Sequence, residues 1–348
     1  MLDAIRRRTP VWRRGDGVAG TEVTDTHPLA TPDMDRVRTD TVAHENPREP
    51  VRVDGDVFVM SGGGAAGAAQ AGMILALIRA GIVPSAVVGC SAGAINAAAI
   101  AANPTVEGAE DLVRTWQTLT GSSMLSGSLW SMAQRVALHR TSLVDRSDLE
   151  ALVDHWFGGS GVSDLADLSM PCHVLTTRLR DGSSVYHTSG PVRDILLASA
   201  AVPGLLPPVR LQDGLHIDGG VVEMVPVSRG LGLGTGRVWV LDVSTANFGA
   251  GTHTSFDLLN GAFTLLARAQ RFGRADPKND ERVRAIELSR DASSASLRDF
   301  GNVPEMLRIG REAAEDRLTA MGLIHAPRRS TGAAWYLPAP HASAARGA

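Results

Sequence analysis

The segment from Val57 to Ala102 constrains the fold more than any other part of this 348-residue sequence. It predicts, in order, a buried apolar strand at 57–60, a glycine-rich loop at 61–67, an apolar helix at 68–80, a short strand at 85–88, a glycine-flanked turn at 89–93 and an alanine-rich helix to 102. Gly81 and Pro84 end the first helix, as these residues commonly do. A strand–loop–helix–strand–turn–helix order is typical of the start of a parallel α/β sheet.

The second turn, Gly89-Cys90-Ser91-Ala92-Gly93, matches the Gly-x-Ser-x-Gly pattern of a nucleophile elbow. In such an elbow the serine lies on a sharp strand-to-helix turn, and the free N–H groups and dipole of the helix favour negative charge beside it. The alternative is that Ser91 only caps the alanine-rich helix. The position between a β-branched strand and a helix favours the nucleophile, and we expect Cys90 to be a small buried residue.

The first loop, Gly62-x-Gly64-x-x-Gly67, fits the dinucleotide-binding fingerprint. That fingerprint needs an acidic residue roughly 20 residues further on to bind the ribose. The sequence has no Asp or Glu between Asp56 and Glu107, so a dinucleotide-dependent oxidoreductase is disfavoured. Two interpretations remain: a row of backbone N–H groups that could form an oxyanion hole, or a tight turn without a ligand.

A third motif, Asp218-Gly219-Gly220, directly follows a predicted hairpin that turns at Asp213-Gly214. An aspartate between an apolar strand and two glycines is not a typical solvated surface charge. Asp-Gly is also a common turn dipeptide, however, so this motif alone does not establish a function.

The three motifs together, with the intervening run 198–208 (Ala-Ser-Ala-Ala-Val-Pro-Gly-Leu-Leu-Pro-Pro), resemble the patatin-like phospholipase family over roughly residues 53–323. The resemblance implies a three-layer α/β/α domain with a mostly parallel central sheet. It also implies acyl-ester hydrolysis by a serine–aspartate dyad without histidine. No metal or cofactor is expected, because the dyad and an oxyanion loop cover the chemistry. By the resemblance Ser91 is the nucleophile and Asp218 its base, and the oxyanion donors are Gly62, Gly63, Gly64 and Ala92.

The sequence departs from the family pattern in two places. Ala66 stands where the family often has Arg or Lys, and Glu223-Met224 replaces a form that commonly contains asparagine. The missing positive charge bears on phospholipid preference more than on hydrolysis. The expected function is therefore a lipid acyl hydrolase of the phospholipase A or lysophospholipase type. The alternatives are a lipid-binding or regulatory relative with little turnover and an acyltransferase with the same dyad.

A conventional triad stays open at this point because three histidines lie on predicted strands. His216 precedes Asp218 by two positions, so both side chains would lie on one face of a strand. His173 and His187 lie on other strands, and the sequence does not settle their distance from Ser91.

Composition sets the boundaries of the domain and excludes some partners. Residues 1–50 and 327–348 are poor in large apolar groups, which predicts loosely attached or flexible arms around a domain at 51–326.

A net charge of −3 disfavours nucleic acid, and two cysteines supply neither a disulfide framework nor a metal cluster. No apolar run reaches the ~20 residues of a membrane span, and no signal peptide is recognisable. A cytoplasmic location is expected, peripheral membrane contact is left open, and the oligomeric state is not predicted.

Apolar periodicity predicts the remaining elements. Helices are expected at 107–120, 129–138, 147–156, 192–201, 255–272 and 302–321, and strands at 171–177, 185–187, 209–211, 215–217, 238–243 and 283–288. The helix at 129–138 is interpreted as a packed connector or, alternatively, as a lid.

Overall fold

The computed structural model describes residues 52–119, 147–157, 161–244, 261–263, 265–267, 269–272, 280–288 and 300–325. The arms predicted at 1–50 and 327–348 and the helix predicted at 129–138 lie outside the described residues. So does the first part of the helix predicted at 255–272; its later part is helical at 261–263, 265–267 and 269.

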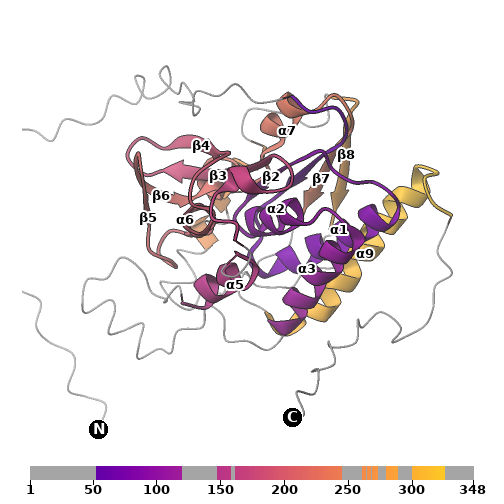
Figure 1. Ribbon diagram of the computed structural model, residues 1–348, viewed down its shortest axis with the longest axis horizontal. Coiled ribbons are helices and arrows are strands. Elements are labelled where there is room, and N and C mark those ends of the chain that lie inside the picture. Colours follow the sequence, from indigo (N-terminus) through magenta and orange to yellow (C-terminus); the bar gives the residue numbers. More distant parts are fainter. Residues whose placement is uncertain are drawn as a thin grey trace, which may run out of the picture. The chain divides into compact units, whose positions relative to one another are not determined.

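One mixed, mostly parallel sheet forms the centre of the described chain (Figure 1). Its strands are β1 (Val57–Met60), β2 (Ala86–Cys90), β3 (Cys172–Arg178), β4 (Ser183–His187), β5 (Val209–Leu211), β6 (Gly214–Asp218), β7 (Val238–Asp242) and β8 (Val283–Glu287). The order is β5-β6-β3-β2-β1-β7-β8, with β4 also paired to β3. The strands β3, β2, β1, β7 and β8 are parallel, whereas β4 and β6 run antiparallel to β3.

Helices cover both faces of this sheet, which confirms the predicted three-layer α/β/α class. The described helices are α1 (Gly67–Arg79), α2 (Ala92–Ala102), α3 (Val106–Thr118), α5 (Ser147–Phe157), α6 (Val192–Ser199), α7 (Val227–Leu233) and α9 (Val303–Ala320). Figure 1 shows α1, α2, α3 and α9 gathered on one side and α7 on the other.

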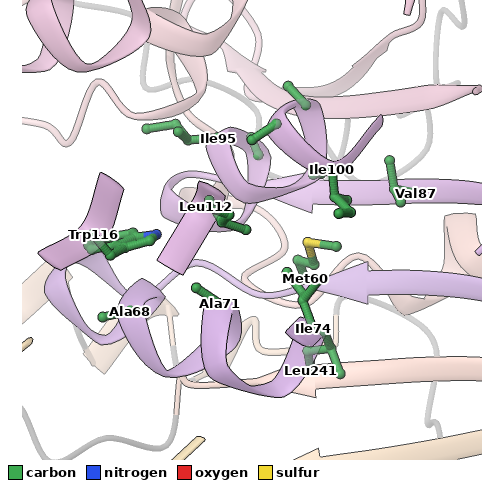
Figure 2. Packing of buried hydrophobic residues seen from close by; sticks show 14 of the residues in the cluster. Met60, Ala68, Ala71, Ile74, Val87, Ile95, Ile100, Leu112, Trp116 and Leu241 are labelled. Atoms are coloured by element: carbon green, nitrogen blue, oxygen red, sulfur yellow. The ribbon is translucent and has the colours of Figure 1, made fainter. Parts of the chain in front are cut away.

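The apolar run of β1 is buried on both faces of the sheet, as expected for a central parallel strand. Phe58 and Met60 belong to the core shared with α1 and α2, whereas Val57 and Val59 belong to the core beneath α7. Figure 2 shows the first of these cores, in which Met60 points toward the helices that carry Ile74 and Ile100. This alternation explains why a continuous apolar stretch, rather than a polar–apolar one, is needed here.

Helix α7 was not predicted from the sequence, because its glycines lower the intrinsic helix propensity. Packing accounts for one of them. A Cβ atom on Gly230 would lie 2.3 Å from Cγ2 of Val59, so only glycine allows α7 to lie this close to β1. Tertiary contact therefore outweighs local preference in this segment.

The strand order places the predicted motifs at one edge of the sheet. From β1 the chain extends to β2 and β3 on one side and to β7 and β8 on the other. In open α/β sheets, ligands bind at the carboxyl ends of strands where the order reverses in this way. The glycine loop follows β1 and the Ser91 turn follows β2, so the two loops meet at this edge.

Candidate active site

Ser91 lies on a strained turn between β2 and α2. Its backbone angles are φ 54° and ψ −126°, and it is the one non-glycine residue with positive φ among the described residues. Such a conformation costs about 1–3 kcal/mol and is concentrated at functional sites. The turn also places Ser91 at the N-terminus of α2, where backbone N–H groups are free of helical partners.

The flanking glycines are required by steric contact with other backbone atoms. A Cβ atom on Gly89 would lie 2.4 Å from the carbonyl oxygen of Gly93. One on Gly93 would lie 2.5 Å from the carbonyl oxygens of both Met60 and Ser61. The Gly-x-Ser-x-Gly pattern therefore allows α2 to pack against its own turn and against the end of β1.

Ser199, at the end of α6, hydrogen-bonds to the Ser91 turn, and the sequence does not predict this contact. The amide N–H of Ser91 donates to Oγ of Ser199 at 2.9 Å, and Oγ of Ser199 donates to the carbonyl of Leu175 at 2.7 Å. Ser199 is fully buried at the end of α6. Its only sequence signal was its place in the Ala-Ser-Ala-Ala run, which carries no chemical indication of this contact.

Asp218 is fully buried at the end of β6, where its Cα pairs with Thr176 of β3. Its Oδ1 accepts a hydrogen bond from the amide of Gly220 at 2.7 Å and a weaker one from Sγ of Cys90 at 3.8 Å. Its Oδ2 has no hydrogen-bond partner of ordinary geometry among the described residues. The hydroxyl of Ser91 is close enough to this carboxylate to lower its pKa.

Burial is the largest influence on Asp218 and raises its pKa to about 6. The Gly220 amide, the Ser91 hydroxyl and the Cys90 thiol act in the opposite direction. At neutral pH the carboxylate is therefore mostly ionised but readily protonated, which suits a general base. Burial, followed by the nearby Asp218 charge, raises the pKa of Cys90 well above its ordinary value, so this thiol stays protonated and donates.

The predicted oxyanion residues separate into two groups. The N–H of Gly62 donates to the carbonyl of Met224 at 3.0 Å and is therefore already used. Within the described chain, the amides of Gly63, Gly64 and Ala92 donate no hydrogen bond, and all three residues line the pocket beside Ser91. An oxyanion site built from these three amides fits the geometry better than one that includes Gly62.

The pocket beside Ser91 and Asp218 has a volume of about 710 Å³, including its open mouth. Apart from these two residues, its described lining consists of glycines and apolar side chains. Trp116 and Phe300 form one wall, with ring centroids 6.4 Å apart and nearly parallel planes. Such a lining suits a hydrocarbon chain and offers no charged group except the Asp218 carboxylate.

The three histidines considered for a triad are all engaged elsewhere. Nε2 of His216 lies 2.7 Å from Oδ1 of Asp213, and its Nδ1 lies 2.8 Å from Oγ1 of Thr176. His187 also bonds to Thr176, and His173 accepts a hydrogen bond from an arginine. Burial lowers the pKa of His187 to about 4 and that of His173 to about 3. None of the three lines the pocket as described.

The second departure from the family pattern, Glu223-Met224, places its two side chains in different surroundings. Glu223 lies away from the pocket, where Tyr186 and Ser228 donate hydrogen bonds to its carboxylate at 2.7 Å and 2.9 Å. Met224 lines the pocket, and its Sδ atom would lie 2.5 Å from a Cβ atom on Gly62. Among the described residues, no group of three His, Cys, Asp or Glu side chains could hold a metal ion.

Sequence comparison places this chain among known proteins. A family model described as "Patatin-like phospholipase" matches residues 58–230. "Lysophospholipase nte1" of Aspergillus terreus is 30% identical over 54% of this chain and 12% of its own length. An uncharacterized NTE family protein of Mycobacterium tuberculosis is 28% identical over 73% of this chain and 42% of its own length.

The chain thus spans less than half the length of these relatives. In a structural comparison, VipD from Legionella pneumophila matches 76% of this chain and 67% of its own, with a TM-score of 0.42 and 14% identity. With the fold class and the three motifs in place, residues 58–230 identify the chain as a member of the patatin-like phospholipase family.

Proposed function

We propose that this protein hydrolyses fatty acyl esters of lipids, as a phospholipase A or lysophospholipase, through a Ser91–Asp218 dyad. The observation that carries the proposal is the buried Oδ2 of Asp218, which lacks an ordinary hydrogen-bond partner among the described residues and belongs to a carboxylate beside Ser91. A serine is a weak nucleophile until a neighbouring base accepts its proton.

The steps follow from these positions. Asp218 accepts the Ser91 proton as the serine oxygen attacks the ester carbonyl, and the amides of Gly63, Gly64 and Ala92 stabilise the resulting oxyanion. The tetrahedral intermediate expels the alcohol, which takes the proton from Asp218, and leaves an acyl-enzyme. Asp218 then accepts a proton from the water that attacks the acyl-enzyme, and it returns this proton to the Ser91 oxygen as the fatty acid is released. Loss of one oxyanion donor typically costs ~2.7–4 kcal/mol of transition-state stabilisation.

The apolar pocket and the relatives support a lipid as the substrate. Apart from Ser91 and Asp218, the described lining consists of glycines and apolar side chains, which would accommodate an acyl chain. The name of the Aspergillus relative, a lysophospholipase, favours a single-chain phospholipid among the candidates. An acyltransferase would use the same acyl-enzyme but transfer the chain to another alcohol.

The deciding experiment combines covalent labelling with a substrate panel. Wild-type protein is expected to react with a fluorophosphonate probe and to hydrolyse lysophosphatidylcholine, diacyl phospholipid or a neutral glyceride. The Ser91→Ala variant should lose the label. Labelling without release of fatty acid from any member of the panel would instead favour a lipid-binding role with little turnover. Absence of both labelling and hydrolysis would contradict the proposal.

A lipid surface is the proposed partner for the outer face of the helical residues 261–263, 265–267 and 269. Phe263 on the inner face lines the pocket, whereas Leu265 and Leu266 are 67% and 58% exposed. The proposed contact is a peripheral one. No helix in the described parts of the chain has the length and apolarity to cross a membrane. A cytoplasmic location stays a prediction.

Replacing Leu265 and Leu266 together with glutamine should lower kcat/KM on phospholipid vesicles by about tenfold or more. Removing two leucines from an apolar interface costs roughly 1.5–3 kcal/mol each at full burial. Hydrolysis of a soluble short-chain ester should stay within about twofold of wild type, because the dyad is untouched. Leu323→Gln, at a leucine 44% exposed just after α9, is the matched control. Equal losses on vesicles and on the soluble ester would contradict the lipid-surface assignment.

A further inference from the structure

A buried network of amide side chains lies behind the glycine loop, and the catalytic steps above do not use it. Gln70 on α1 is fully buried. Its Nε2 donates to the carbonyl of Ser61 at 2.7 Å and to the carbonyl of Leu241 at 3.0 Å, and it lies 3.3 Å from Oγ of Ser61. Oγ of Ser61 also accepts from the amide of Val243 at 2.9 Å. Gln70 thus ties the start of the glycine loop to the end of β7.

Asn96 on α2 continues the network to the helix that begins at the elbow. Its Nδ2 donates to Oε1 of Gln70 at 3.0 Å and to the carbonyl of Gly67 at 2.9 Å. Its Oδ1 accepts from Nε1 of Trp116 at 2.9 Å. Because an indole N–H can only donate, this last contact fixes which end of the Asn96 amide faces Trp116. Every polar atom of the two amides is therefore satisfied.

The network reaches the pocket through Trp116. The Trp116 ring lines the pocket and packs against the start of α1, where a Cβ atom on Gly67 would lie 2.9 Å from Cζ2. Figure 2 shows Trp116 beside the helix that carries Ala68, with Ile95 of α2 nearby. The network of Gln70, Asn96 and Trp116 therefore joins the pocket wall and the helix behind Ser91 to both ends of the glycine loop, through the carbonyls of Ser61 and Gly67.

We infer that Gln70 and Asn96 are positioning residues that fix the oxyanion loop relative to Ser91, with Trp116 anchoring the network at the pocket. The inference rests on the proposed function. Oxyanion donors must lie 2.7–3.1 Å from the developing charge, and preorganised donors act without reorganising during the reaction. A buried network that loses one partner leaves others unsatisfied, so the loop that it holds is free to shift.

Asn96→Leu and Gln70→Leu test this inference by a split between kcat and KM. Each variant is expected to lower kcat by about 10–100-fold on a soluble ester while KM stays within about threefold, because the pocket is retained. A trifluoromethyl ketone, which forms a tetrahedral adduct with the serine, should bind more weakly in proportion to the loss of kcat/KM. Binding of oleate, which makes no adduct, should stay within about threefold.

Two further variants separate positioning from loss of stability. Ile100→Ala removes a buried apolar side chain from the same helix and makes no change in hydrogen bonding, so it should lower the melting temperature with kcat near wild type. Trp116→Phe removes the indole donor and makes the side chain smaller but keeps an aromatic ring, and a loss in kcat of about three- to tenfold is expected. This milder variant keeps the test decisive if a leucine variant does not fold.

The outcomes distinguish the inference from the proposed function. Network variants that keep kcat within twofold and ketone affinity unchanged, in an active and labelled wild-type background, would overturn the inference alone. The inference would also be overturned if the network variants lost no more kcat than Ile100→Ala does at the same melting temperature. Wild-type protein that neither hydrolyses nor labels would overturn the proposed function and this inference with it.

Discussion

Ser91→Ala is expected to lower kcat for ester hydrolysis by on the order of 10⁴-fold or more, and Asp218→Asn by at least about 10³-fold. Loss of the nucleophile or its base in serine hydrolases has effects of this size, because the two act as one unit. The double variant should therefore be little worse than Ser91→Ala alone. The measurement is steady-state hydrolysis of a soluble ester, with residual rates compared with the uncatalysed reaction.

Matched controls come from polar residues outside the dyad. Ser244 is a buried serine whose hydroxyl donates to Asp242, so Ser244→Ala should keep kcat within about threefold. Asp213→Asn and His216→Asn alter a hydrogen-bonded histidine–aspartate pair at β6, in which His216 is buried and Asp213 is exposed. A large loss of kcat in either of these two variants, together with an active Asp218→Asn variant, would contradict the dyad and indicate a histidine-dependent mechanism.

Local sterics explain why the elbow and the fold class could be predicted from the sequence. Glycine at 89 is required by contact with Gly93 in the same turn, and glycine at 93 by contact with the end of β1. Both lie in one short contiguous pattern, so the pattern itself carries the information. The same holds for the buried strand β1, whose apolar run shows that both of its faces are covered. The order of the three motifs along the chain was then enough to indicate the family.

Long-range contacts explain what could not be predicted. Ser199, Gln70 and Asn96 have partners that are distant in sequence, and none belongs to a recognisable local pattern. The engagement of Gly62 by the Met224 carbonyl likewise depends on how the Asp218 loop returns to β1. The residue types indicate which chemistry is available. Which of the neighbouring backbone amides are free to bind an oxyanion follows only from the three-dimensional structure.

The raised pKa of Asp218 predicts that activity and stability respond to pH in opposite directions. The base must be ionised to accept the Ser91 proton, so kcat/KM should rise as the pH increases through about 6 and then level off. The contribution of Asp218 to the free energy of unfolding changes in the opposite direction and falls as the pH increases. Folding raises this pKa from 3.8 to about 6, so the folded state favours the protonated acid. That contribution is present below pH ~4 and is lost as the pH rises through about 6.

Asp218→Asn should therefore become more stable relative to wild type as the pH increases from 4 to 8. A shift of about two pKa units corresponds to at most about 3 kcal/mol, and we expect a gain of roughly 1–3 kcal/mol between these limits. Urea unfolding of both proteins across this range measures the difference, and titration of all other groups largely cancels in the comparison.

Ser244→Ala, which leaves this carboxylate in place, should show a difference from wild type that does not vary with pH. A constant difference for Asp218→Asn as well would mean that the carboxylate ionises as readily in the folded chain as in the unfolded one. Burial would then not be tuning the base, and the pH dependence of activity would have to arise from another group.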